Sequence, residues 1–305
     1  MIEEGQKITV TVEKISLGGD GIARAGGLVL FVPYAAPGDE LEVQVTAKKK
    51  TFGRAKIINI IKESLARVVP PCPLYFNPAI PAQAPCGGCD FQHLNYSAQL
   101  NAKAQALKET FEKIAGVSPN METPLAMEEG EEWRYRNKMQ IPFAKDSQGK
   151  VVAGFFSPGS HSVVPLTDCL IHSEQVASLV SFIVQKMNDF GLEPYSEKTH
   201  RGWLRHALIR ESSEGKMLLA FVTSSEIFHK KQEWAAELTA KFPSLVGILQ
   251  NINPEKTNVI LGEKWRSLYG KDFLIESVAG IRLRISAGSF FQVNSKMAEK
   301  LYFLG

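Results

Sequence analysis

The cysteines of this 305-residue chain are few and unevenly placed, and they constrain the fold more than any other feature. Cys72, Cys86 and Cys89 lie on one loop rich in glycine and proline, and Cys169 follows far downstream. The glycines of Cys86-Gly-Gly-Cys89 allow the backbone to fold around a bound centre. Four thiolates can hold one metal centre if the fold brings Cys169 to the loop. We therefore expect a four-cysteine metal site.

Two other interpretations compete with a metal site. Disulfides need an oxidising compartment, but the N-terminus is polar and acidic and has no apolar signal segment, which predicts a cytoplasmic protein with reduced thiols. Four unrelated buried cysteines are the second alternative. A Cys-x-x-Cys pair on a Gly/Pro loop favours the metal site over both. Ligand softness leaves zinc and iron–sulfur open, because both accept four thiolates.

Composition sets only broad limits. The chain is 44% hydrophobic and 22% charged, as is typical of globular proteins, and is long enough for two or three domains. It contains no apolar run of about 18 residues, so we expect no membrane span. The net charge of +3 is mild, so any case for a nucleic-acid partner depends on where the positive charges lie.

Residues 1–62 predict a small β-barrel. Four β-branched, partly alternating runs separated by glycine turns cover residues 8–15, 28–32, 41–45 and 54–61. This spacing favours a five-stranded barrel of the oligonucleotide-binding type. Basic residues gather near its end, at Lys48, Lys49, Lys50, Arg54, Lys56 and Lys62. They could follow a phosphate backbone or form a solvated hairpin tip, and the sequence supports both equally.

Residues 63–120 contain a proline-bearing linker, the cysteine loop and a helix expected over residues 97–114. Apolar residues follow one face of that helix, at Leu100, Ala104, Leu107, Phe111 and Ile114. We expect this face to be core, packed beside the metal site.

Residues 121–288 predict a central α+β domain. Strands are expected at residues 133–143, 151–156, 204–211, 217–223, 245–250 and 281–286, and helices at residues 174–190 and 231–241. In a strand, Arg134, Arg136 and Lys138 would share one face, with Trp133 and Tyr135 on the other. This face could contact phosphates, or it could simply be exposed above a packed aromatic face.

Several segments resemble the RNA (uracil-5-)methyltransferase family. The stretch from Cys86 to Leu100 resembles its cluster loop, although thirteen residues separate Cys72 from Cys86 where the family has a handful. Residues 18–24 and 31–40 look like its TRAM domain. Tyr135-Arg-Asn-Lys138 resembles a segment near substrate RNA, and Leu166-Thr-Asp-Cys-Leu-Ile-His172 matches the site of the last cluster cysteine. Ser289-Phe-Phe-Gln-Val-Asn294 resembles the entry to the methyltransferase domain, and Asn294 is expected to cap a helix that follows it.

The resemblance implies a 4Fe–4S cluster on Cys72, Cys86, Cys89 and Cys169. It also implies that Phe290 and Gln292 border an S-adenosylmethionine pocket, and that the barrel and the Trp133–Lys138 segment bind RNA. A barrel together with a cluster favours 23S ribosomal RNA over transfer RNA. The implied fold is multidomain α+β, with a TRAM barrel, an iron–sulfur loop plus helix, a central domain and, in residues 289–305, only the beginning of a Rossmann-like domain.

The catalytic half of the family follows this point. No strand followed by a glycine-rich cofactor turn occurs in the chain. Uracil carbon 5 becomes nucleophilic only after a thiolate adds to carbon 6, and four cluster ligands leave no cysteine for that role. We therefore expect a truncated or split enzyme that is inactive without a separately encoded C-terminal half. The alternative is a stand-alone RNA-binding protein with a structural metal site.

Overall fold

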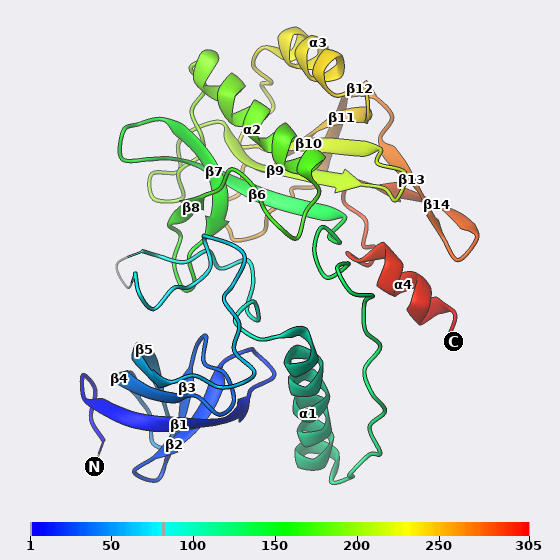
Figure 1. The fold of residues 1–305 in the computed structure, drawn as a ribbon. Coiled ribbons are helices and arrows are strands. Elements are labelled where there is room, and N and C mark those ends of the chain that lie inside the picture. Colours follow the sequence, from blue (N-terminus) through cyan, green and yellow to red (C-terminus); the bar gives the residue numbers. More distant parts are fainter. Residues whose placement is uncertain (1, 81–82, 305) are drawn as a thin grey trace. The chain divides into compact units, whose positions relative to one another are not determined.

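The computed structural model describes residues 2–80 and 83–304. It divides into two compact units, Met1–Ala126 and Met127–Gly305, and each is described by itself (Figure 1). None of the helices in the described part of the chain is long and apolar enough to cross a membrane.

The first unit contains a closed five-stranded barrel, as the sequence predicts. Its strands are β1 (Lys7–Ile15), β2 (Gly21–Ala25), β3 (Leu28–Val32), β4 (Glu40–Lys48) and β5 (Phe52–Lys62). They follow the order β1-β2-β3-β5-β4, in which only the β3–β5 pairing is parallel. Alternate residues point inward and form one core, which includes Val10, Val12, Leu30, Leu41 and Val43. Closure removes the exposed edges that an open sheet of this size would present.

Glycines in the turn before β2 let the barrel approach the cysteine loop of the same unit. A Cβ atom on Gly19, whose φ is +92°, would lie 3.0 Å from the Asp90 Cβ atom. A Cβ atom on Gly21 would lie 2.7 Å from the Ala35 Cβ atom. These glycines are therefore required by close contacts as well as by the turn.

Helix α1 (Tyr96–Ala115) forms where the sequence predicts it, but the prediction for its apolar face was wrong. The Asn95 side chain caps its N-terminus. Small residues near the beginning of α1, Ala98 and Ala102, contact the cluster around Leu94. The apolar residues farther along are exposed, with fractions of 43%, 44% and 81% for Leu107, Phe111 and Ile114. Periodicity finds an apolar stripe but does not reveal whether another element covers it.

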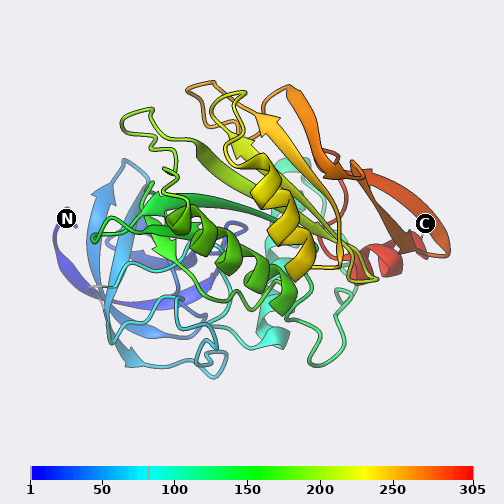
Figure 2. The ribbon, with the colours of Figure 1, turned by 90° about the horizontal axis from the view of Figure 1, so that it is seen from above.

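The second unit is built on a seven-stranded sheet of order β12-β11-β10-β9-β6-β7-β8. The strands are β6 (Lys138–Lys145), β7 (Val151–Phe156), β8 (Val163–Pro165), β9 (Leu204–Glu211), β10 (Met217–Thr223), β11 (Leu245–Ile252) and β12 (Lys264–Gly270). Helices α2 (Glu174–Asp189) and α3 (Lys231–Lys241) lie across one face of it (Figures 1 and 2). The main core fills the space between these helices and the sheet, and includes Leu179, Ile183, Phe221, Trp234 and Leu238.

A hairpin and a short helix complete the second unit. The hairpin pairs β13 (Phe273–Val278) with β14 (Ile281–Ser286), and Leu274 and Ala287 join a second core cluster with sheet residues. Helix α4 (Ser295–Tyr302) follows, and its predicted cap is confirmed because the Asn294 side chain accepts a hydrogen bond from the Met297 amide.

Most predicted elements of the second unit are confirmed, with one correction that affects the candidate site. The strand expected from residue 133 begins only at Lys138. Arg134 has a φ of +56°, which interrupts the extended backbone before β6. The strands β8, β12 and β13 were not predicted from sequence. β12 is largely exposed, so its residues lack the apolar alternation from which strands are recognised.

Candidate functional site

The cysteine loop of the first unit is held against the barrel by buried polar and aromatic contacts. Arg67 donates to both carboxylate oxygens of the fully buried Asp39 and to the Tyr34 carbonyl oxygen. The Tyr34 ring stacks on Phe76, with centroids 4.5 Å apart. The Tyr75 hydroxyl donates to the Asp90 carbonyl oxygen at 2.8 Å. The loop thus has a defined aromatic lining although its described residues form no helix or strand.

Three thiols lie within this lining. Burial raises the pKa of Cys86 and Cys89, and the negative charge that Cys72 would carry as a thiolate raises the pKa of both further. Across residues 2–80 and 83–304, however, no three His, Cys, Asp or Glu side chains are grouped closely enough to hold a metal ion. Cys169 belongs to the second unit. The four-cysteine site stays a prediction.

The basic residues of the barrel surround one hairpin end. Lys49 and Lys50 lie in the turn between β4 and β5, and Lys48 ends β4. No ion pair involves these three side chains in the part of the chain that is described. Arg54 differs, because its guanidinium lies 3.3 Å from the Asp20 carboxylate. The lysines thus form an exposed hairpin tip with free positive charge.

The predicted basic stripe of the second unit was wrong for Arg134. Its guanidinium pairs with both carboxylate oxygens of Asp168, each at 2.7 Å, and also donates to the carbonyl oxygens of Cys169 and His172. Arg134 therefore fixes the loop that carries Cys169. Because β6 starts after it, the period-two alternation that would align Arg134 with Arg136 and Lys138 does not apply.

The structure brings the Arg136–Lys138 segment together with the loop that carries Phe290 and Gln292. Asn137 connects them: its side-chain amide donates to the Gln292 carbonyl oxygen and to the Ser295 hydroxyl oxygen, both at 2.9 Å. The Asn137 backbone amide donates to the Val293 carbonyl oxygen. The Phe290 side chain is 85% exposed. An aromatic ring and an amide are thus presented to solvent beside two basic residues.

Arg210 is a residue of this site that sequence reasoning missed. It lies on β9, is 2% exposed, and donates to the Ala287 and Ser289 carbonyl oxygens, which precede Phe290. Burial lowers the pKa of Arg210 to about 10. Burial, followed by the charges of Arg210 and Arg136, also lowers the pKa of Lys138. The signal available in the sequence was a basic residue directly after the apolar residues 207–209 of a predicted strand.

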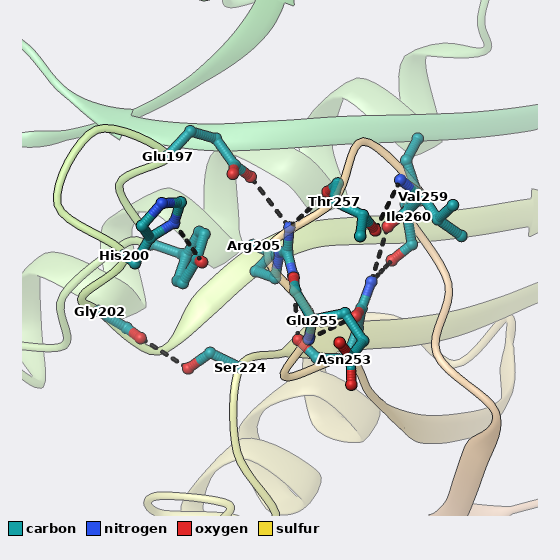
Figure 3. A network of polar contacts seen from close by, with 11 residues as sticks. Glu197, His200, Gly202, Arg205, Ser224, Asn253, Glu255, Thr257, Val259 and Ile260 are labelled. Carbon is teal, nitrogen blue, oxygen red and sulfur yellow. Dashed lines mark hydrogen bonds and ion pairs between the residues drawn. The ribbon is translucent and has the colours of Figure 1, made fainter.

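A second polar network surrounds Arg205, near the other end of β9 (Figure 3). Its guanidinium donates to the carbonyl oxygens of Asn253, Glu255 and Thr257, and it pairs with Glu197 at 3.1 Å. The Tyr195 ring lies 4.4 Å from the guanidinium carbon. One buried cation thereby fixes the loop that follows β11, because three of its carbonyl groups point at the same guanidinium.

A cavity of about 530 Å³ adjoins this network. Lys145, Phe156, His161, Tyr195 and Arg201 are among the residues that line it. Gly202 shapes one wall: its φ is +107°, and a Cβ atom there would lie 2.1 Å from the Pro194 carbonyl oxygen. The His206 Nδ1 atom is buried beside the cavity and has no hydrogen-bond partner within the described residues. The size is within the range of small-molecule sites.

Comparison with known proteins places this geometry in context. Residues 2–58 match the TRAM domain family. The chain is 38% identical, over 99% of its length, to an uncharacterized RNA methyltransferase of Listeria monocytogenes, and 33% identical to one of Halalkalibacterium halodurans. It spans 64% of the length of each relative.

The fold is similar to a solved structure. A Pyrococcus abyssi tRNA (uracil-54, C5)-methyltransferase in complex with S-adenosyl-L-homocysteine superposes with a TM-score of 0.69 at 22% identity. The superposition covers 97% of this chain and 64% of the other.

These comparisons bear on two expectations. They do not support the prediction of an inactive chain that contains only the beginning of a methyltransferase fold and needs a separate C-terminal half. The prediction of a TRAM barrel is confirmed. The chain therefore carries a TRAM domain and is similar, over nearly its whole length, to part of proteins named as RNA methyltransferases.

Proposed function

We propose that this chain acts in S-adenosylmethionine-dependent methylation of uracil carbon 5 in RNA. The observation that carries the proposal is the 33–38% identity to RNA methyltransferases over 99% of the chain. The uracil assignment rests on the family resemblance and is supported by the fold neighbour. A stand-alone RNA-binding protein fits less well, because the relatives are named as methyltransferases.

RNA binding is assigned to two surfaces, one on each unit. Lys48, Lys49, Lys50 and Arg54 would contact phosphates from the barrel. The three lysines have no ion-pair partner among the described residues, which supports this role, whereas Arg54 would have to share its charge with Asp20. Arg136 and Lys138 would do so from the second unit. Arg134 would support this second surface indirectly, because its own guanidinium is already bonded to Asp168.

The cofactor would meet Phe290 and Gln292. S-adenosylmethionine supplies an electrophilic methyl group when it is bound. An exposed aromatic ring and amide suit an adenosine-containing ligand, because the ring can stack and the amide can both donate and accept. Asn137 and Arg210 hold the backbone of this loop, so the two side chains project from a fixed frame.

A 4Fe–4S cluster is proposed on Cys72, Cys86, Cys89 and Cys169. The donor set suits it chemically, since thiolates are the ligands of such clusters and all four cysteines are partly buried. Thiols whose pKa is raised by burial would lose their protons on binding iron. The cluster is tested by anaerobic purification with iron and sulfide assays. Colourless protein with stoichiometric zinc would contradict it.

RNA binding tests the function directly. We expect the purified chain to bind structured RNA with a steep dependence on salt, and 23S ribosomal RNA fragments to compete better than transfer RNA. No binding near 0.15 M salt would overturn the proposal. If transfer RNA competed better, the proposed substrate would change from ribosomal to transfer RNA, and the proposal of RNA binding would stand. In a second assay with methyl-labelled S-adenosylmethionine, label at a position other than uridine carbon 5 would replace the assignment to uracil.

A further inference from the structure

We propose that Lys138, Arg210 and Arg136 form a binding site for one phosphate group of an RNA strand, beside the loop that carries Phe290. This proposal rests on the proposed function and adds to it a defined phosphate position and a residue, Arg210, that no sequence motif marks. Three observations support it: the register of β6 and β9, the lack of a carboxylate partner for these cations among the described residues, and the contacts of the adjoining loop.

Strand register places two cations directly opposite each other. β6 and β9 are antiparallel, and Lys138 pairs with Arg210 in their register. Residues opposite each other in such a pair project to the same face, with Cβ atoms about 4.5–5.5 Å apart. Arg136 adds a third charge, since its Nε atom donates to the Lys138 carbonyl oxygen at 3.2 Å. Like charges in this position destabilise a sheet unless an anion offsets them.

No carboxylate supplies that offset. Within residues 2–80 and 83–304, none of the ion pairs includes Arg136, Lys138 or Arg210. The guanidinium of Arg210 bonds to carbonyl oxygens, which accept hydrogen bonds but leave the charge uncompensated. Lys145, at the other end of β6, shows the contrast, because it pairs with Glu193 at 2.7 Å. The three cations thus form a partly buried positive site without an internal partner.

The neighbouring loop relates this site to the proposed chemistry. Arg210 donates to the Ser289 carbonyl oxygen, and Asn137 donates to the Gln292 carbonyl oxygen. The backbone on both sides of Phe290 is therefore bonded to strand β9 and to Asn137, the residue before β6. A phosphate held by Lys138 would place its nucleotide beside this loop, next to the proposed cofactor contact at Phe290.

Two other sources could supply the same anionic chemistry: free phosphate, and the carboxylate of the methyl donor. An RNA phosphate is favoured because the carboxylate of the methyl donor has an ammonium group beside it, which would add positive charge next to the three cations, whereas a phosphodiester brings only negative charge. A strand with repeated phosphates would also give the strong salt dependence that such a site produces. The experiment below separates the three sources.

The test compares Lys138→Gln with Lys145→Gln, a control on the same strand whose lysine has a carboxylate partner. Removing Lys138 relieves repulsion, so we expect an unchanged or higher melting temperature, whereas Lys145→Gln should leave it unchanged or lower it. Inorganic phosphate, at an ionic strength matched with sodium chloride, should raise the melting temperature of the wild type and not that of Lys138→Gln.

The RNA arm uses an unstructured labelled oligonucleotide. Lys138→Gln should weaken its binding several-fold and reduce the log–log salt slope by about 0.7, the value for one phosphate contact on a single strand. Lys145→Gln should change neither. Equal effects of the two variants on RNA binding would overturn the proposal while leaving RNA binding itself intact.

Two outcomes identify the other sources. If S-adenosylhomocysteine stabilises the wild type and only Lys138→Gln abolishes that effect, with RNA affinity unchanged, the anion is the cofactor carboxylate and the RNA assignment is wrong. If inorganic phosphate binds the wild type but RNA affinity does not depend on Lys138, the site takes free phosphate and the RNA assignment is again wrong. Absence of RNA binding by the wild type would instead contradict the proposed function.

Discussion

The β4–β5 hairpin of the first unit and strand β9 of the second unit are both rich in basic residues, yet they use them in opposite ways. The hairpin tip carries Lys48, Lys49 and Lys50, which lack ion-pair partners in the described residues and border solvent. β9 is buried along nearly all of its length and carries Arg205, His206 and Arg210. The lysines of the hairpin present their positive charge to solvent, whereas the two arginines of β9 hold neighbouring loops through hydrogen bonds to backbone carbonyl oxygens.

Because of this difference, substitutions in the hairpin should change RNA binding without changing folding stability, and substitutions in β9 should change folding stability. Replacing an exposed lysine changes the free energy of unfolding little, because solvent and salt screen its charge. A buried arginine bonded to several carbonyl oxygens leaves those acceptors unpaired when it is removed. The same change of residue type should therefore affect RNA affinity in one region and unfolding in the other.

The largest effect is expected for Arg210→Gln. This change leaves the Ala287 and Ser289 carbonyl oxygens without their donor, and we expect a loss of about 3 kcal/mol in the free energy of unfolding. Urea denaturation followed by circular dichroism measures it. Lys49→Gln is the control and should be neutral. If the two variants were equally stable, the buried arginine of β9 would contribute no more to folding stability than the exposed lysine of the hairpin.

A pH effect of similar size is expected from His206. Burial, then the charge of Arg205, lowers its pKa from 6.5 to about 4 in the folded protein. The unfolded chain therefore binds more protons between those values, so stability is full above about pH 6.5 and is lost as the pH falls towards 4. The loss should reach about 3 kcal/mol.

The pH prediction is tested by urea titrations from pH 7.5 to pH 4.5 on the wild type and on His206→Gln. The difference between the two stabilities should shrink as the pH falls. A constant difference would mean that His206 titrates normally despite its burial. Such a result would mean that His206 is more exposed to solvent than the structure indicates, as the lysines of the hairpin are.

A smaller effect is expected for Arg134→Lys. Lysine keeps the charge but cannot form the two-point contact with Asp168 or reach both loop carbonyl oxygens. Because the pair is partly exposed, we expect a loss of about 1 kcal/mol. Thermal unfolding measures the change. Arg54→Lys, at an exposed single-point pair, is the matched control and should cost less.

The smallest effect on stability, with the clearest effect on binding, is expected at the hairpin tip. Replacing Lys48, Lys49 and Lys50 together by glutamine should leave the melting temperature within error. The salt slope of RNA binding should fall by up to about three units if each lysine meets a phosphate. Filter binding at several salt concentrations measures this. An unchanged slope would show that the lysines are only a solvated tip.

The sequence by itself determined the barrel, most strands of the second unit and the α4 cap. These depend on local periodicity and on turn and cap residues, which act between near neighbours in the chain. The TRAM motif was visible for the same reason, because its glycines satisfy close contacts within one small barrel. Phe290, Gln292 and the basic segment that follows Trp133 came instead from the family resemblance, and their roles stay predictions.

Only the tertiary structure decided which charges are free and which apolar faces are covered. Arg134 and Arg136 are two residues apart, but Asp168 engages the first and not the second. Lys138 lies opposite Arg210 because β6 and β9 are paired in one register, and Phe111 stays exposed because none of the described elements of its unit covers that part of α1. Such outcomes depend on partners distant in the chain, and their energies are set by burial and distance, which residue spacing does not contain.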